Sequence, residues 1–154
     1  MSFLEALRLV PGKWEMGVYG GGAELKKAQN YAQRFGLPVK FYGDTPFSKV
    51  QKAIMEADLD VLVSYNYDTF GMTLIEAEAC GVPAFFCDPD LKEVVPMGGY
   101  VLARGPEPEA MAAALNDLLA HPERIAKMSG VMVKNRKRVL ISQRIKTLET
   151  LFTF

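Results

Sequence analysis

Two kinds of hydrophobic spacing alternate along the chain. Short apolar runs predict strands at residues 14–19, 39–42, 60–64, 84–87 and 99–102. Between these runs, apolar residues recur at helical spacing over residues 2–10, 23–35, 47–57, 72–80 and after Pro106. Strands that alternate with helices predict βαβ units, in which parallel strands form a sheet that helices cover on both faces.

This pattern predicts an α/β fold. We expect a Rossmann-like, doubly wound parallel sheet in three layers, forming a single domain over residues 1–154. Ser2 and Glu5 have the spacing of a capping box, so the chain is expected to begin on a helix. Residues 122–154 are expected to form C-terminal helices, with a break near Gly130.

The length and composition are those of one ordinary globular domain. The 154 residues are 49% hydrophobic and 23% charged, which excludes disordered, fibrous and disulfide-stapled classes. Cys80 and Cys87 are interpreted as reduced core residues, since they show no spacing typical of zinc ligands. No apolar run approaches the roughly 18 residues that span a bilayer, and no leader pattern is present, so a cytoplasmic protein is expected.

Charge is balanced overall but uneven along the chain. Lys+Arg and Asp+Glu number 18 each, residues 1–120 carry a net charge of −6, and residues 121–154 carry +6. The acidic body indicates no nucleic-acid partner. The basic run at 134–138 is most often a solvated helix face, and its alternative contacts are phosphate, an anionic membrane or an absent acidic domain.

The segment 64–83 carries the most specific chemistry. A loop leaves the predicted strand 60–64, presents Asp68, turns at Gly71 and enters a helix. The first amides of that helix, from Gly71 to Thr73, lack intrahelical acceptors and lie at the positive end of the helix dipole, so they can bind phosphate. Glu76, about one turn further, can accept hydrogen bonds from ribose hydroxyls.

This segment resembles the donor-binding motif of family 4 (group 1) retaining glycosyltransferases of the GT-B fold. The matching residues are Asp68, where the family usually has Glu, the pair Phe70-Gly71, Glu76 and the turn Ala79-Cys80-Gly81-Val82-Pro83. The resemblance covers almost the whole chain. It implies the C-terminal donor domain of a two-domain enzyme, whose N-terminal acceptor domain and basic phosphate-binding pair would precede Met1.

The resemblance also implies a role for each matching residue. Asp68 and Glu76 would be the catalytic-site acids, with Asp68 on the transferred sugar and Glu76 on the nucleotide ribose. Backbone amides from Phe70 to Thr73, the Gly20-Gly21 turn and the loop from Phe41 to Asp44 would hold the rest of a nucleoside-diphosphate sugar. The residues concerned are Gly20 and Gly21 near the diphosphate, Phe41, Tyr42 and Gly43 near the base, and Phe70, Gly71, Met72 and Thr73 around sugar and diphosphate. No metal and no other cofactor is expected.

The resulting hypothesis is the donor-binding part of a hexosyltransferase, inactive alone, with peripheral membrane contact in the full enzyme and self-association of the isolated chain. Two alternatives stay open. One is a non-enzymatic nucleotide-binding or regulatory module of receiver type, although the glycines 20–22 after the first strand stand where a receiver has acidic residues. The other is a pseudoenzyme that keeps the fold without donor binding. The sequence names neither the sugar, nor the base, nor the acceptor.

Overall fold

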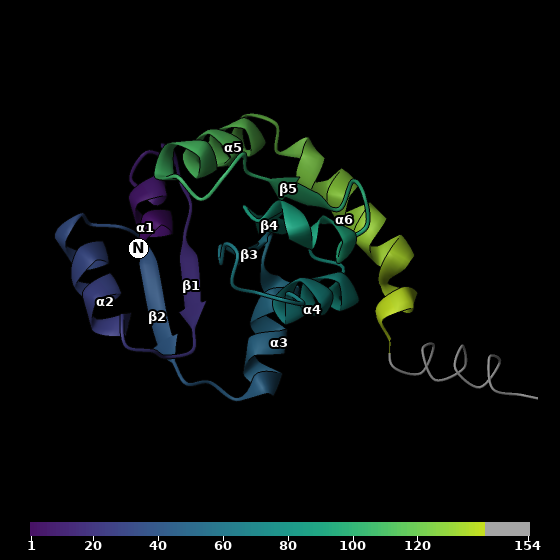
Figure 1. Ribbon diagram of the computed structural model, residues 1–154, viewed down its shortest axis with the longest axis horizontal. Helices are drawn as coiled ribbons and strands as arrows, with labels where there is room; N and C mark the ends of the chain where they lie inside the picture. The colour runs from purple at the N-terminus through teal and green to yellow at the C-terminus, as the bar shows by residue number, and fades with distance from the viewer. Residues whose placement is uncertain (141–154) are drawn as a thin grey trace, which may run out of the picture.

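The structure is a computed structural model that describes residues 1–140. The expected helices beyond residue 140 lie outside the described residues. Figure 1 shows the arrangement of the elements. In chain order they are α1 (Ser2–Leu7), β1 (Met16–Tyr19), α2 (Leu25–Arg34), β2 (Val39–Gly43), α3 (Phe47–Glu56), β3 (Asp60–Leu62), α4 (Met72–Cys80), β4 (Ala84–Phe86), η1 (Pro89–Glu93), β5 (Tyr100–Leu102), α5 (Pro108–Ala120), α6 (Glu123–Asn135) and η2 (Arg136–Val139).

All strand pairs are parallel, which confirms the predicted α/β class. Strand β1 pairs with β2, with Met16 opposite Val39, and a register shift follows Val18. The other sheet has the order β3-β4-β5, with Ala84 between Asp60 and Tyr100. Among residues 1–140 the strands therefore form two hydrogen-bonded sheets, which lie side by side in Figure 1.

Strand β4 lies between two hydrophobic cores. Phe85 joins the core that α1 and α5 form with β5, and residues of β1 and β2 pack against this core. Ala84 and Phe86 point the other way, into the core that α3, α4 and α6 line. Side chains alternate across a strand, so one three-residue strand contributes to both cores, and all three of its residues are buried.

Two local predictions are wrong. Met1, not Ser2, is the N-cap of α1, and no side chain caps this helix, so the capping box does not form. Helix α6 runs through Gly130 without a break. A Cβ at Gly130 would meet nothing within 4 Å, so the residue costs the helix some propensity but does not disturb its packing.

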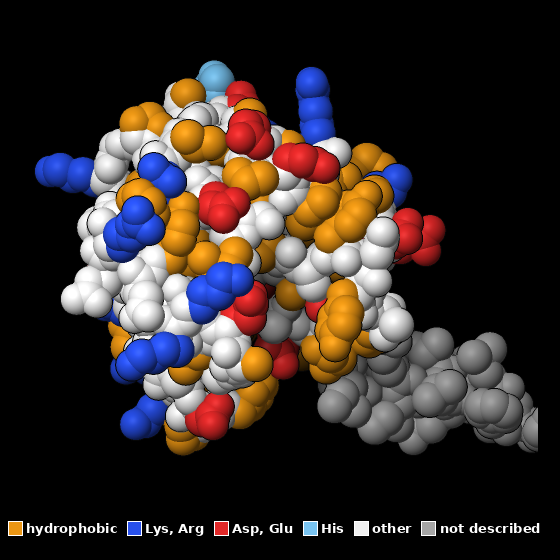
Figure 2. Space-filling view, turned by 60° about the vertical axis from the view of Figure 1, so that its left-hand side comes forward, with side chains coloured by type: hydrophobic (Ala, Val, Ile, Leu, Met, Phe, Trp, Pro, Cys, Tyr) orange, Lys and Arg blue, Asp and Glu red, His pale blue; other side chains and the backbone are white. Residues whose placement is uncertain are grey.

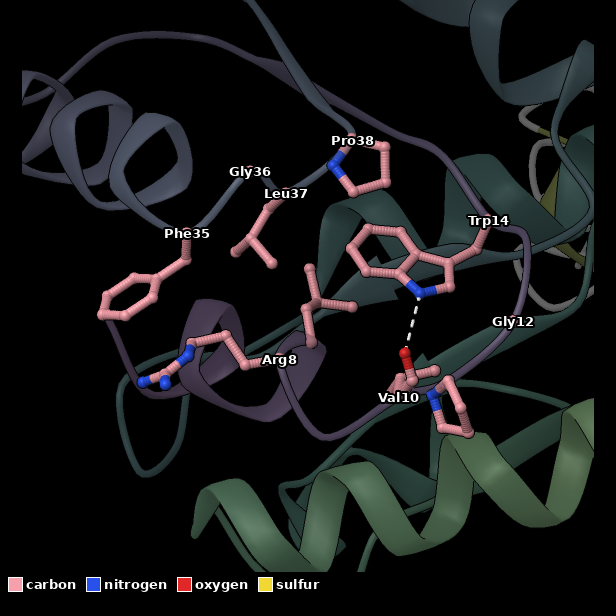
Figure 3. A pocket seen from close by; sticks show the side chains of 10 residues that line it. Arg8, Val10, Gly12, Trp14, Phe35, Gly36, Leu37 and Pro38 are labelled. Carbon is pink, nitrogen blue, oxygen red and sulfur yellow. Dashed lines mark hydrogen bonds between the residues drawn. The ribbon is translucent and has the colours of Figure 1, made fainter.

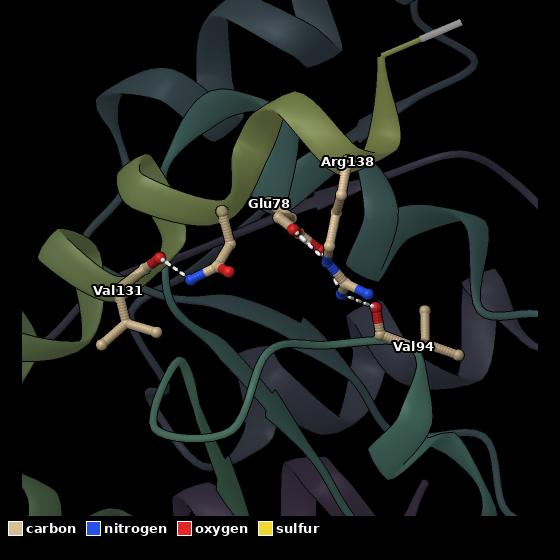
Figure 4. Close-up of polar contacts among 5 residues, drawn as sticks. Glu78, Val94, Val131 and Arg138 are labelled. Carbon is tan, nitrogen blue, oxygen red and sulfur yellow. Dashed lines mark hydrogen bonds and ion pairs between the residues drawn. The ribbon is translucent and has the colours of Figure 1, made fainter. Parts of the chain in front are cut away.

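Arg138, in the basic run, is bound to the body of the protein. Its Nε and one terminal nitrogen donate to the two carboxylate oxygens of Glu78, at 2.6 Å each, and that nitrogen also donates to the carbonyl of Val94 at 2.5 Å. Figure 4 shows this arrangement. Glu78 is fully buried. Arg138 therefore holds η2 against α4 and the residue after η1, while 42% of its side chain stays exposed, so this residue of the basic run is both solvated and bound to the body.

Candidate functional site

The loops that follow β1 and β2 meet through their glycines. The amide of Gly20 donates to the carbonyl of Gly43 at 2.7 Å. Both residues have positive φ, +100° and +63°. A Cβ on Gly21 would lie 3.3 Å from Oδ1 of Asp44. The structure thus brings together the predicted residues of these two loops, and glycine allows their backbones to approach closely.

Phe41 and Tyr42 point to opposite faces of β2. Phe41 is partly buried, whereas Tyr42 is half exposed and its ring is stacked on that of Tyr19, with centroids 4.6 Å apart and planes 6° from parallel. The rings lie over Gly17, where a Cβ would come within 2.9 Å of Tyr19 and 3.3 Å of Tyr42. The Tyr42 ring is therefore engaged with Tyr19 on the sheet face.

The N-terminus of α4 has the features that suit an anion. Gly71 is its N-cap in left-handed conformation, with φ +57°, and no side chain caps the helix. The first intrahelical bonds run from Leu74 and Ile75 back to Gly71, so the amides of Met72 and Thr73 lack an acceptor within the helix. Phe70, Met72 and Thr73 are exposed. This end of the helix is open to a ligand.

Packing fixes the position of Gly71. The residue is buried, and a Cβ there would lie 3.1 Å from Leu74 and 3.4 Å from Leu91. Both the space and the positive φ require glycine at this turn. The entry into α4 is consequently held by the core beneath it.

Asp68 lies in the loop before this helix. It is partly buried, and the hydroxyl of Ser64 donates to its Oδ2 at 2.7 Å. The backbone of Asn66, between them, is bound by Asp88. Ser64 within the loop and Asp88 after β4 therefore hold the loop in the conformation that presents Asp68.

Glu76 lies in a hollow of about 130 Å³ between α3 and α4. The side chains around it are mostly apolar, and its burial raises the pKa of its carboxyl. Burial and the nearby charge of Glu76 raise the pKa of Asp60, at the start of β3, to about 6. Oδ2 of Asp60 has no hydrogen-bond partner within the described residues. In the sequence, Asp60 is distinguished only as the first residue of the predicted strand 60–64.

The predicted residues thus form two groups. Gly20, Gly21 and the residues of the β2 end share one loop pair, and Asp68 to Glu76 follow β3. Within residues 1–140, no hydrogen bond or ion pair joins the first group to the second. Sequence reasoning did not identify Asp88 as a residue that supports the site. Asp88 follows an apolar run, but it lies outside the 64–83 motif, so only its position after a strand could have indicated it.

A larger cavity, of about 480 Å³, lies elsewhere, near the start of β1 and β2 (Figure 3). Trp14 donates from Nε1 to the carbonyl of Val10 at 3.1 Å, and the Arg8 guanidinium lies 3.7 Å from the centre of the Phe35 ring. None of the predicted site residues lines this cavity. It lies at the amino ends of the strands, whereas ligands of doubly wound sheets bind at the carboxyl ends.

The described residues contain no group of three or more His, Cys, Asp or Glu side chains placed to hold a metal ion. In the same residues, no helix combines the length and apolar character needed to cross a bilayer. Figure 2 shows one face of the molecule, on which Asp and Glu side chains stand among Lys and Arg. That face presents no continuous basic surface.

Comparisons with known proteins agree with this architecture. The family model described as "Glycosyl transferases group 1" matches residues 2–138. Over 91 residues, 56% of this chain, the sequence is 31% identical to the lipopolysaccharide 1,6-galactosyltransferase of Salmonella typhimurium, of which it covers 25%. Over 84 residues, 53% of this chain, it is 37% identical to the D-inositol 3-phosphate glycosyltransferase of Thermobispora bispora, of which it covers 19%.

A solved structure shows the same fold. HepE of Anabaena in complex with UDP-glucose has a TM-score of 0.80 at 21% identity, over 97% of this chain and 43% of that one. The chain therefore spans less than half the length of each of these three proteins. Its matched range and its parallel α/β architecture assign it to a family: this chain belongs to the group 1 glycosyltransferases and has the Rossmann-like fold of GT-B enzymes.

Proposed function

We propose that this chain is the donor-binding domain of a retaining hexosyltransferase and binds a nucleoside-diphosphate sugar. The observation that carries the proposal is the uncapped N-terminus of α4 at Gly71, directly after the loop that presents Asp68. Free amides at the positive end of a nine-residue helix suit a diphosphate, and a neighbouring carboxylate suits sugar hydroxyls. The UDP and UDP-glucose bound to solved neighbours support this class of donor.

In the proposed complex, each group has one task. The amides from Phe70 to Thr73 hold the diphosphate and the sugar. Asp68 accepts hydrogen bonds from the sugar, and Glu76 accepts them from the ribose. Hydroxyl donors favour the charged form of a carboxylate, so ribose binding should lower the pKa of Glu76, which burial raises in the free protein. The helix dipole offsets the charge of the departing diphosphate, and the proposal includes no metal cofactor.

The glycines of the first two loops would complete the donor site. Gly20 and Gly21 leave room for the diphosphate, and the segment Phe41–Gly43 lies near the base in the proposed arrangement. The ring of Tyr42 is stacked on Tyr19 through one face and stays half exposed, so both its ring and its backbone can face the base. These assignments extend the proposal to the β1–β2 pair.

We further propose that residues 1–154 need an acceptor-binding domain for activity. A basic residue that neutralises the diphosphate is absent from the described loops after β1, β2 and β3, which contain no Lys or Arg. The chain covers 25% or less of the two enzymes compared above, so most of each enzyme lies outside the matched region. We therefore expect weak donor binding and no transfer by this chain alone.

Calorimetric titration tests the donor site. We expect UDP, GDP or ADP to bind more weakly than micromolar, and one of the matching nucleotide sugars to bind with comparable affinity. Glu76→Gln should weaken nucleotide binding by about 1–3 kcal/mol, the cost of losing hydrogen bonds to a charged group. Glu109→Gln, on the exposed side of α5, is the matched control and should leave binding unchanged.

Two outcomes would contradict the proposal. Absence of binding by every nucleotide and nucleotide sugar at millimolar concentration would favour a pseudoenzyme. Equal weakening by both glutamine variants would assign the effect to net charge and not to Glu76.

A further inference from the structure

Asp88 follows β4 and is almost entirely buried, with 2% of its surface exposed. Both of its carboxylate oxygens accept hydrogen bonds from backbone amides. Oδ2 accepts from Asn66 at 2.7 Å, and Oδ1 accepts from Asp90 at 3.0 Å. The second bond caps the short helix η1, whereas the first crosses to the loop after β3. A single carboxylate thus joins two loops that follow neighbouring strands.

The residue bound by Asp88 has unusual backbone geometry. Asn66 has a φ of +54°. Within residues 1–140 it is the only residue other than glycine with a positive φ. Such conformations are costly and persist where surrounding contacts maintain them. A charge-assisted bond of 2.7 Å to a buried acceptor is a strong contact of this kind. Asp88 therefore stabilises the left-handed turn at Asn66.

This turn determines where Asp68 lies. Ser64 precedes the turn and Asp68 follows it, and the hydroxyl of Ser64 donates to Oδ2 of Asp68 at 2.7 Å. A change at Asn66 would separate the two ends of this bond, because only one residue, Tyr67, lies between Asn66 and Asp68. Asp88 acts on Asp68 through the backbone and has no bond to it within residues 1–140.

We propose that Asp88 is a positioning residue of the donor site, which fixes the Ser64–Asp68 loop so that Asp68 meets the sugar part of the donor. The identity of the ligand rests on the proposed function, whereas the contact of Asp88 with the Asn66 amide is a property of the free protein. Asp88 should therefore affect the sugar more than the nucleotide, since the α4 amides that suit the diphosphate lie beyond Asp68.

The test compares three variants by calorimetry. Asp88→Asn keeps the side-chain volume and one acceptor oxygen, but removes the charge and one acceptor. It should lower the affinity for the best-bound nucleotide sugar about tenfold, as expected for a charge-assisted bond, and leave the affinity for the corresponding nucleoside diphosphate nearly unchanged. Asp90→Asn is the matched control, because Asp90 is exposed and contributes only its amide. Asn66→Gly keeps the amide donor and tolerates positive φ, so it should bind like the wild type.

Amide hydrogen exchange provides a readout that needs no ligand, and its measurement on the wild type needs no variant. In the wild-type chain, the Asn66 amide should exchange much more slowly than its exposed neighbours Tyr65 and Tyr67. In Asp88→Asn it should exchange faster, while amides of α5 should not change. Exchange of the wild-type Asn66 amide at the rate of a free peptide would overturn the proposal, as would an equal loss of sugar and diphosphate affinity in Asp88→Asn. If the wild type binds no nucleotide at all, the proposed function fails, and slow exchange at Asn66 would still support the contact with Asp88.

Discussion

Among the ion pairs of residues 1–140, the pair of Arg138 and Glu78 is the one in which one partner has no exposed surface, so breaking it should be costly. Arg138→Met removes a bidentate partner from a carboxylate with no exposed surface and leaves its charge buried. Breaking a buried pair from one side costs about 3–5 kcal/mol. The Arg138 side chain is 42% exposed, so water can reach part of the vacated space, and we expect the lower end, about 3 kcal/mol. This corresponds to a fall of about 6–12 °C in Tm for a chain of this size.

Replacing both partners should restore most of the loss. Glu78→Met with Arg138→Met exchanges the pair for apolar side chains of similar length, which is commonly neutral or stabilising. Lys137→Met is the matched control, because Lys137 is exposed and adjacent, and it should change the free energy of unfolding by less than about 0.5 kcal/mol. Urea unfolding followed by circular dichroism gives the free energy of unfolding of the wild type and of each of the three variants. A loss below about 1 kcal/mol in Arg138→Met, or a double variant as unstable as this single one, would refute the reasoning.

Two further predictions concern stability. The pKa of Asp60 is raised from 3.8 to about 6, so the folded state holds a proton that the unfolded state has released, and the wild type should lose stability as pH rises through this window. Asp60→Asn should remove that loss and gain up to about 3 kcal/mol at neutral pH in urea unfolding; an unchanged pH slope would show that Asp60 titrates normally. Gly130→Ala should stabilise α6 by up to about 1 kcal/mol, because alanine has the higher helix propensity. Gly71→Ala should destabilise the protein by about 1–3 kcal/mol, because Gly71 has a positive φ. Thermal unfolding measures both changes, and effects of the same sign would contradict this contrast.

The sequence predicted the order of the strands and α-helices in the described residues because their signals are local, but it did not predict η1. Helix α4 was predicted with its observed bounds, since apolar spacing starts after Gly71 and stops at Gly81. The break at Gly130 was wrong because glycine is a weak signal inside a helix that packs along one side. The failed capping box at Ser2 shows the same limit, since spacing alone does not decide which residue enters the first turn.

The candidate site was less predictable, because its supports are distant in sequence. Asp68 and Gly71 were found through a contiguous motif, but Asp88 is 22 residues from its partner Asn66, and Arg138 is 60 residues from Glu78. Neither pair has a characteristic spacing. A buried carboxylate also has no signal in one sequence that distinguishes it from a solvated one, and Glu78 and Asp88 became recognisable only once burial was known.

The position of β4 has a consequence for cooperativity. Because its side chains enter both hydrophobic cores and its backbone pairs with β3 and β5, opening β4 disrupts both cores at once. The β1–β2 pair joins one core only, and separating it breaks no backbone hydrogen bond of the other sheet. The fold thus contains a central unit that opens only with global unfolding and a lateral unit that is able to open in part. A ligand bound by loops of both units would make the lateral unit unfold together with the central one. The amides of the lateral unit would then exchange more slowly with solvent, although neither core gains a contact.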